Sequence, residues 1–162
     1  MFIPSSSGGW AADLYRAFTQ PGQGYKSAHE MSADMANHSG VTSESLVKDS
    51  LKQIANIDQG LQGGNAFLEI NRNARNEAKA LDQERANGQV RSYLHGVPVA
   101  LKDVFETQGN MQTSAGSKAL VGAPATKNAK VVDQLLKAGM VIVGKTNMSE
   151  LSNFRSCWFY PQ

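Results

Sequence analysis

An α/β fold is the class that this sequence of 162 residues predicts. Segments with apolar residues at helical spacing alternate with short apolar runs that glycines bound. This alternation is typical of layered folds in which helices cover a sheet. The length fits one domain or a part of a larger one, and no repeat at a fixed period suggests a solenoid.

The beginning of the chain predicts little regular structure. Residues 1–27 are rich in Ser, Gly, Gln and Pro, which predicts a loose segment with room for one short helix. Residues 28–40 are small and polar with scattered apolar side chains, and they predict a partly helical segment. We therefore interpret residues 1–40 as a leader that is helical in part.

The first strongly periodic helix follows Val41. Thr42 or Ser43 can cap its N-terminus, and Gly63-Gly64 ends it. Its apolar residues recur at helical spacing and predict one face packed on a core: Leu46, Val47, Leu51, Ile54, Ile57 and Leu61. Residues 66–70 form a short apolar run that predicts a strand. Residues 71–87 place few apolar side chains among many charges, which predicts a solvated helix that ends at Gly88.

The second half of the chain alternates in the same way. Residues 96–101 are an apolar run with Pro98 near its start, which predicts a buried strand. Residues 128–138 have apolar side chains on one face and end at Gly139, as a helix does. Residues 140–143 predict another strand, and residues 147–153 predict the start of a further helix.

The composition excludes several classes of protein. Hydrophobic residues make up 41% and charged residues 19%, so the chain as a whole is not intrinsically disordered. A net charge of +2 does not favour nucleic acid or an anionic membrane as partner. The sequence has no apolar run of about 20 residues and no signal peptide, and its single cysteine, Cys157, forms no intrachain disulfide. We expect a soluble, cytoplasmic protein without a cofactor.

Three local motifs suggest chemistry that their context does not support. Residues 139–146 match the P-loop pattern, but the four intervening residues are apolar and predict a strand rather than a phosphate-binding loop. The pair Ser45 and Lys48 matches S-x-x-K inside a helix without the accompanying motifs. The histidines lie outside any metal-binding motif, so no metal site is expected: His29, His38 and His95.

Lys102 is the residue most indicative of function. It follows the apolar run 97–101 directly and precedes Asp103. Burial of an unpaired ammonium is costly, which leaves two interpretations open. Either Lys102 reaches solvent or pairs with Asp103, or it is desolvated and becomes a neutral amine that can accept a proton.

The sequence around Lys102 resembles a known family. The segment His-Gly-Val-Pro-Val-Ala-Leu-Lys-Asp, residues 95–103, is similar to the lysine strand of the amidase signature family. The resemblance continues in family order and with family-like spacing through 65–70, 80–82, 113–120 and 129–151. It covers residues 41–156, most of the chain.

The resemblance implies a fold and a reaction. The fold is the N-terminal part of a mixed sheet covered by helices, incomplete in this chain. The reaction is hydrolysis of a carboxamide C–N bond in small-molecule amides, with a Ser–Ser–Lys triad in which Lys102 is the general base. Ser114 and Ser117 correspond to a structural loop and not to the nucleophile, and residues 145–147 correspond to a strand end near the pocket.

The chain departs from the family in one respect. Both catalytic serines are expected beyond Ser156, whereas residues 157–162 form a tail that does not resemble the family. We therefore interpret 41–156 as the N-terminal third of an amidase domain and expect a truncated protein that is inactive alone. The alternative is a non-catalytic isoform or pseudoenzyme that acts by binding a partner. Apolar surface left uncovered would favour self-association.

Overall fold

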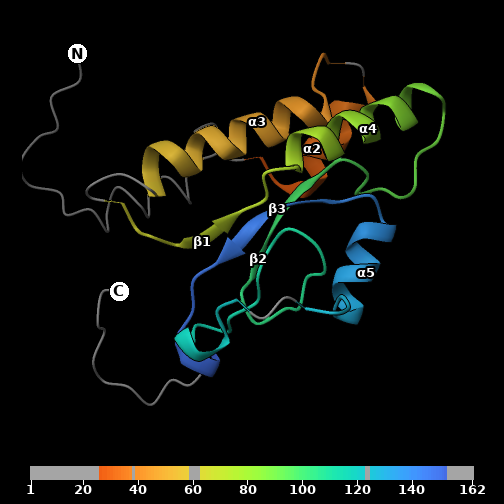
Figure 1. Cartoon of the computed structure of the whole chain (residues 1–162). Coiled ribbons are helices and arrows are strands. Elements are labelled where there is room, and N and C mark those ends of the chain that lie inside the picture. Colours follow the sequence, from red (N-terminus) through yellow and green to blue (C-terminus); the bar gives the residue numbers. More distant parts are fainter. Residues whose placement is uncertain (1–25, 38, 59–62, 123–124, 153–162) are drawn as a thin grey trace, which may run out of the picture.

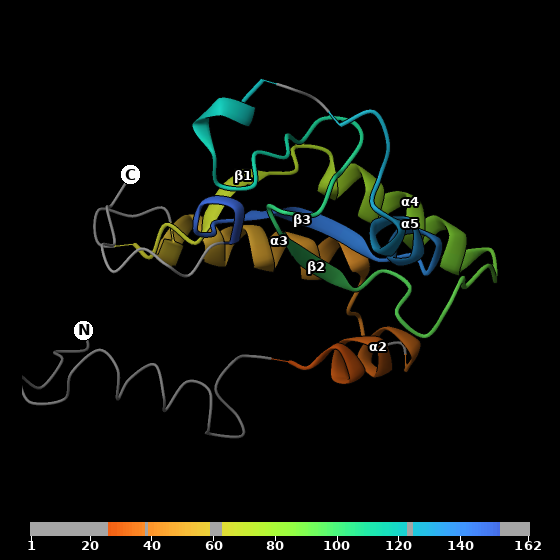
Figure 2. The same cartoon turned by 90° about the horizontal axis from the view of Figure 1, so that it is seen from below.

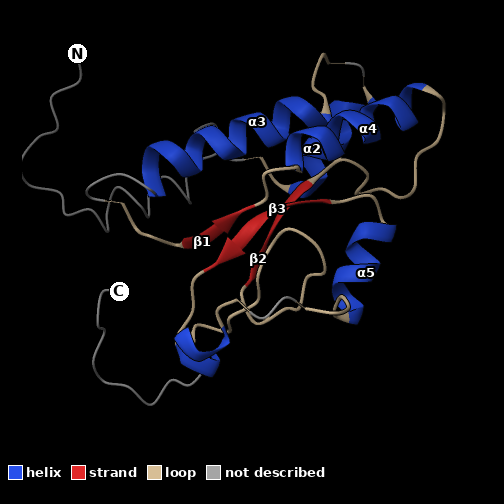
Figure 3. Cartoon of the chain, in the orientation of Figure 1, coloured by secondary structure: helices blue, strands red, loops and turns tan. Residues whose placement is uncertain are grey.

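A mixed sheet with helices on both of its faces forms the centre of the molecule (Figure 1). The computed structural model describes residues 26–37, 39–58, 63–122 and 125–152. Within them the structure confirms the predicted α/β class, with the helices packed around a small sheet (Figure 3).

The sheet has three strands in the described part of the chain. They are β1 (Phe67–Ile70), β2 (Pro98–Lys102) and β3 (Val141–Thr146), in the order β1-β3-β2. β3 is central and pairs antiparallel with β1 and parallel with β2. The strands predicted from the apolar runs are therefore confirmed. β3 is longer than predicted, because Gly144 and Lys145 continue the ladder past the last apolar residue.

Four α-helices are present within the described residues. They are α2 (Ala28–Ala36), α3 (Ser43–Gln53), α4 (Ala74–Ala86) and α5 (Lys130–Lys137). A single π-helical turn, Ile54–Asp58, continues α3. α2 lies apart from the sheet (Figure 2), where the Ser32 hydroxyl donates a hydrogen bond to the Tyr93 carbonyl at 2.5 Å.

Two apolar clusters hold the layers together. The first joins α3 and α4 to one face of β3, and its buried residues are Val47, Ala74, Ala78, Leu81, Val141 and Val143. The second joins α5 and a loop to the other face, and its buried residues are Leu101, Met111, Val132 and Ile142. Alternate residues of β3 serve opposite clusters, as the period of two in a strand requires.

The N-terminus of α3 is fixed by two sets of hydrogen bonds. Thr42 and Ser45 form a reciprocal capping box, which explains the serine of the S-x-x-K match. The Asp82 carboxylate of α4 accepts hydrogen bonds from the Ser43 and Glu44 amides at 2.7 and 2.9 Å. These contacts satisfy amide groups that a helix start leaves without intrahelical partners.

Three predictions about elements need correction. The helix predicted over 71–87 is not simply solvated, because Ala74 and Ala78 are fully buried and their small side chains let α4 pack closely on α3 and β3. Residues 147–152 form only a 3₁₀ turn at Glu150–Ser152, where Leu151 and Ser152 have positive φ angles. The regular α-helix after Val41 ends at Gln53.

Several sequence predictions concern residues that the structure does not describe. The segment 1–25, His38 and the tail at 157–162, including Cys157, lie outside the described residues. α2 shows that the segment 28–40 contains a helix. In the part of the chain that the structure describes, no helix has the length and apolar character needed to cross a membrane.

Candidate functional site

Lys102 is the last residue of β2 and lies beside Thr146 of β3. The strand was expected to be buried, but only Leu101 within it is, whereas Ala100 and Lys102 are exposed. The reason is that β2 forms an edge of the sheet among the described residues. The Phe105 amide donates to the Lys102 carbonyl at 3.0 Å, so the chain turns immediately after the strand.

A buried ion pair lies next to this strand end. Lys145 of β3 is 0% exposed and Asp103 is 3% exposed, and the Lys145 Nζ lies 3.1 Å from the Asp103 Oδ1. Asp103 therefore pairs with Lys145 and not with its sequence neighbour Lys102. Within the described residues the Lys102 side chain has no hydrogen bond or ion pair.

Hydrogen bonds satisfy both members of this pair. The Lys145 Nζ donates to the Gln112 carbonyl at 3.0 Å and to the Thr113 Oγ1 at 2.9 Å. The Asp103 Oδ2 accepts from the Ser114 amide at 3.0 Å and from the Ser114 Oγ at 2.5 Å. A buried charge is tolerated when it is paired with an opposite charge and its remaining hydrogen-bond donors or acceptors have partners. Both conditions hold for Lys145 and Asp103.

A β-bulge gives Lys145 this position. Strict alternation from Val143 would place Lys145 on the face that α3 and α4 cover. The register with β2 shifts by one residue between Val99 and Ala100, so that Leu101 lies beside Lys145. Bulges commonly re-aim a side chain in this way. Lys145 thus reaches the loop on the other face of the sheet.

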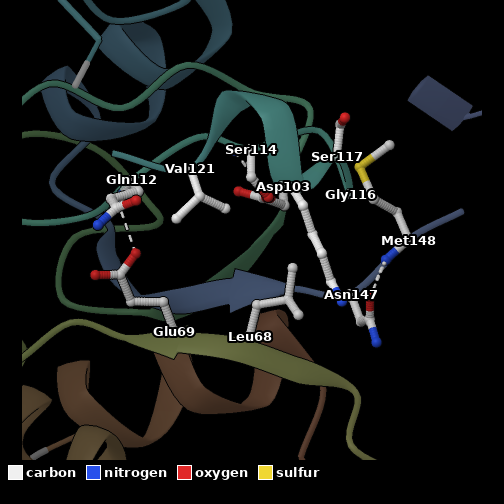
Figure 4. Close-up of a pocket in the computed structure, with 11 residues that line it drawn as sticks. Leu68, Glu69, Asp103, Gln112, Ser114, Gly116, Ser117, Val121, Asn147 and Met148 are labelled. Carbon is white, nitrogen blue, oxygen red and sulfur yellow. Dashed lines mark hydrogen bonds between the residues drawn. The ribbon is translucent and has the colours of Figure 1, made fainter. Parts of the chain in front are cut away.

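A pocket of about 460 Å³ opens beside the pair. Leu68 and Glu69 of β1 line one side and Asp103 and Ser114 the opposite side (Figure 4). Lys102 is not among the lining residues. The remaining lining residues are Gln112, Gly116, Ser117, Lys118, Val121, Asn147 and Met148. Asn147, which belongs to the strand end at 145–147, is one of these lining residues, and the correspondence of 145–147 to a strand end near the amidase pocket stays a prediction.

Both serines of the loop direct their hydroxyls at carboxylates. The Ser114 Oγ donates to Asp103, and the buried Ser117 donates to the Glu150 Oε1 at 2.7 Å. Neither hydroxyl is hydrogen-bonded to Lys102. The structural role that the resemblance implies for the segment 113–117 stays a prediction. Gly116 allows the close packing, because a Cβ there would lie 2.9 Å from the Met148 carbonyl oxygen.

The other candidate motifs have structural explanations. Residues 141–146 of the P-loop match form β3, and Lys145 is buried in the ion pair. His95 is fully buried, with its Nε2 2.9 Å from the Leu81 carbonyl oxygen and its Nδ1 accepting from the Arg91 amide at 3.3 Å. In the described residues, no three His, Cys, Asp or Glu side chains are grouped to hold a metal ion.

Comparison with known proteins decides the family. The family model Amidase matches residues 45–160. This chain belongs to the amidase family. A putative amidase of Schizosaccharomyces pombe is 45% identical over 92 residues, which cover 57% of this chain and 16% of that protein. A glutamyl-tRNA(Gln) amidotransferase subunit of Anaeromyxobacter sp. strain K is 45% identical over 113 residues, which cover 69% of this chain and 22% of that protein.

Solved amidase structures agree with the fold. The peptide amidase of Stenotrophomonas maltophilia superposes with a TM-score of 0.77 and 37% identity, over 84% of this chain and 27% of that protein. The chain therefore spans roughly a sixth to a quarter of the length of these relatives. The sheet and helices described above correspond to one part of the amidase fold.

Proposed function

We propose that this chain provides the lysine-bearing part of an amide-hydrolysing site, with Lys102 as the proton acceptor. In this proposal a serine outside residues 41–156 attacks the carboxamide carbon. Its proton passes through a second serine to the Lys102 Nζ and then to the departing amine. Acyl transfer of this kind needs a hydroxyl activated by an adjacent base, which a neutral lysine can be.

The observation that carries the proposal is the state of Lys102 at the end of β2. Its side chain is exposed, and the adjacent carboxylate of Asp103 is occupied by Lys145. Within the described residues no carboxylate is paired with the Lys102 Nζ, so this group is accessible to a hydroxyl supplied by another part of an amidase fold. Membership of the amidase family supports the same assignment, because the segment 95–103 is the part that resembles the lysine strand of the family.

The 162-residue chain alone is proposed to be inactive. Ser114 and Ser117 donate their hydroxyls to carboxylates rather than to Lys102. A triad lacking one member retains little of its activity, because its residues act as a unit. Purified chain incubated with a small aryl amide is expected to release no amine above the buffer rate, and release that Lys102→Ala abolishes would contradict this expectation.

A chimera tests the role of Lys102 directly. Residues 41–156 would replace the matching segment of the Stenotrophomonas maltophilia peptide amidase, which supplies the rest of the fold. We expect the chimera to hydrolyse peptide amides and Lys102→Ala to lower kcat by about a thousandfold or more. Lys137→Ala, which removes an exposed lysine of α5, is the matched control and should keep full activity.

The outcome separates catalysis from binding. If Lys102→Ala in a folded, active chimera left kcat within about threefold of the unaltered chimera, Lys102 would not be the base. The relatives include both amidases and amidotransferases, at similar identity. Both groups are therefore candidates for the full-length function, and a carboxamide is the substrate class that we propose.

Binding of a partner without catalysis is the second candidate. Exposed apolar side chains on the described surface favour it: Val104, Phe105, Leu120 and Val121. Self-association of the chain remains a prediction on the same grounds. Sedimentation equilibrium over a concentration series would detect it as a mass that rises above 17.4 kDa, and a constant monomer mass would contradict it.

A further inference from the structure

The buried pair Asp103–Lys145 lies one residue from the proposed base, yet the proposed reaction does not use it. By sequence alone, Asp103 is the obvious partner of Lys102. In the structure the Asp103 Oδ1 lies 3.1 Å from the Lys145 Nζ, and the Asp103 Oδ2 accepts hydrogen bonds from the Ser114 amide and hydroxyl. Both carboxylate oxygens are therefore engaged without Lys102.

We propose that Lys145 is a positioning residue for Lys102: by pairing with Asp103, it keeps that carboxylate from pairing with Lys102. This inference rests on the proposed function of Lys102 as a base. A carboxylate without its own cation would favour the ammonium form of a neighbouring lysine. Lys145 removes that effect and holds Asp103 at the end of β2.

The geometry supports an effect of charge rather than of direct contact. Leu101 and Lys145 are register partners, and the side chain that follows Leu101 points to the opposite face of β2. Lys102 and the buried pair are therefore on opposite sides of the strand. The Asp103 amide donates to the Thr146 carbonyl at 3.0 Å, which ties the residue after Lys102 to β3.

The other charged groups near the end of β2 are exposed, line the pocket or have partners of their own. Glu106 follows the turn after Lys102 and is exposed. Glu69 of β1 accepts a hydrogen bond from the Gln112 amide at 2.7 Å. Lys118 lines the pocket and is the first residue of the 3₁₀ turn Lys118–Leu120. On α3, which contacts β2, the charged residues are Glu44, Lys48, Asp49 and Lys52, and Glu44 is engaged by Arg75. Asp103 is the carboxylate nearest to Lys102 in the chain.

Competitive acetylation of the 162-residue chain tests this inference without any need for turnover. Limiting acetic anhydride at about pH 8.5 reacts only with neutral amines, so the labelling rate of Lys102 reports its neutral fraction. Peptide mass spectrometry gives the rate for Lys102 relative to Lys130, an exposed lysine of α5. Amide NMR spectra show whether each variant is folded.

The variants have distinct expected results. Lys145→Met leaves the Asp103 carboxylate without its cation and should lower the relative labelling of Lys102 about three- to tenfold, because an uncompensated carboxylate favours the ammonium form of a neighbouring lysine. Lys145→Arg keeps the charge and should label as the unaltered chain does. The double variant Asp103→Asn/Lys145→Met removes both charges and should restore the rate. Lys137→Met removes a lysine that precedes the opposite end of β3 and should change nothing.

A purely structural role would give another pattern. Loosening of the strand end would leave Lys102 labelling unchanged in Lys145→Met or alter it equally in the double variant, and either result overturns the inference. Should Lys145→Met fail to fold, the unaltered chain still gives a test. Native Lys145 should label at least tenfold more slowly than Lys102, and equal labelling of the two would show that the pair does not hold.

Failure of the proposed function would look different. If Lys102→Ala left the chimera active while Lys145→Met still suppressed Lys102 labelling, the electrostatic coupling would stand and the catalytic assignment would fall. If Lys102→Ala abolished activity but Lys145→Met left labelling unchanged, Lys102 would remain the base and Lys145 would have no part in its protonation.

Discussion

Gly144 of β3 is the position at which a single added methyl group should disturb the sheet most. It lies in the central strand between Val143 and Lys145, where β1 pairs with β3 and Ile70 is the register partner of Gly144. A Cβ at Gly144 would lie 2.4 Å from the Glu69 carbonyl oxygen and 3.1 Å from the Phe67 Cδ1. The variant Gly144→Ala therefore tests whether β1 and β3 pack as closely as the structure has them.

The expected loss of stability follows from these distances. A relaxed carbon–oxygen contact is about 3.3–3.6 Å, so β1 would have to move by roughly 1 Å away from Gly144. Overpacking of this kind usually costs about 1–3 kcal/mol, and the carbonyl belongs to the backbone and cannot rotate away as a side chain would. Alanine recovers about 0.5–1 kcal/mol because it is less flexible than glycine in the unfolded chain. Because a backbone carbonyl cannot move aside, the overpacking cost lies at the upper end of that range, and the net loss in the free energy of unfolding is about 2 kcal/mol.

Thermal and urea denaturation followed by circular dichroism would measure this loss. For a chain of this size the Tm should fall by about 4–8 °C. Gly64→Ala is the matched control, because its φ angle is not positive and a Cβ there would meet only the Asp58 Oδ1, at 3.6 Å. Its Tm should stay within about 2 °C of the unaltered chain. A Tm for Gly144→Ala equally close to that value would refute the packing of β1 on β3.

Three further predictions concern charged groups. Lys145→Met should lower the free energy of unfolding by about 3 kcal/mol in urea titrations, whereas the double variant Asp103→Leu/Lys145→Met should lose much less; equal losses would contradict a buried pair. The hydrogen bond from Arg75 lowers the pKa of Glu44 below 4.5, so this pair stabilises the fold above pH 4.5 and the contribution is lost as the pH falls through the lowered pKa. Glu44→Gln should flatten that part of the stability profile, and an unchanged profile would contradict the assignment. Asp82→Ala should cost about 1 kcal/mol in thermal denaturation, because it removes two hydrogen bonds to the start of α3; a loss below about 0.3 kcal/mol would show that water replaces them.

The sequence predicts those parts of the fold that local pattern determines. The strands near 66–70 and 97–101 and the helix near 128–138 are confirmed, because the two apolar runs are too short for a helix and the helix has its apolar residues at helical spacing. α4 was interpreted as solvated because two of its three buried residues are alanines. Small side chains contribute little to a hydrophobic pattern, although Ala74 and Ala78 are fully buried against α3 and β3.

The charge arrangement of the site could not be predicted in the same way. Lys102 and Asp103 are adjacent in the chain, whereas Asp103 and Lys145 meet only through the pairing of β2 with β3. Alternation along β3 would place Lys145 on the other face, and the bulge beside Ala100 reverses this. No local pattern in the sequence indicates where a bulge falls.

Burial of the strand at 96–101 was wrongly expected for a related reason. An apolar run predicts a strand, but its side chains are covered only if elements lie on both faces and both edges of that strand. β2 has β3 on one edge and α5 with its loop on one face, so Leu101 is buried while Ala100 and Lys102 are exposed. The charge that is buried is instead Lys145, at the centre of the sheet, where a cation requires a carboxylate. The position of Asp103 therefore follows from the burial of Lys145. Because Asp103 is paired with Lys145, it is not the ion-pair partner of the Lys102 side chain.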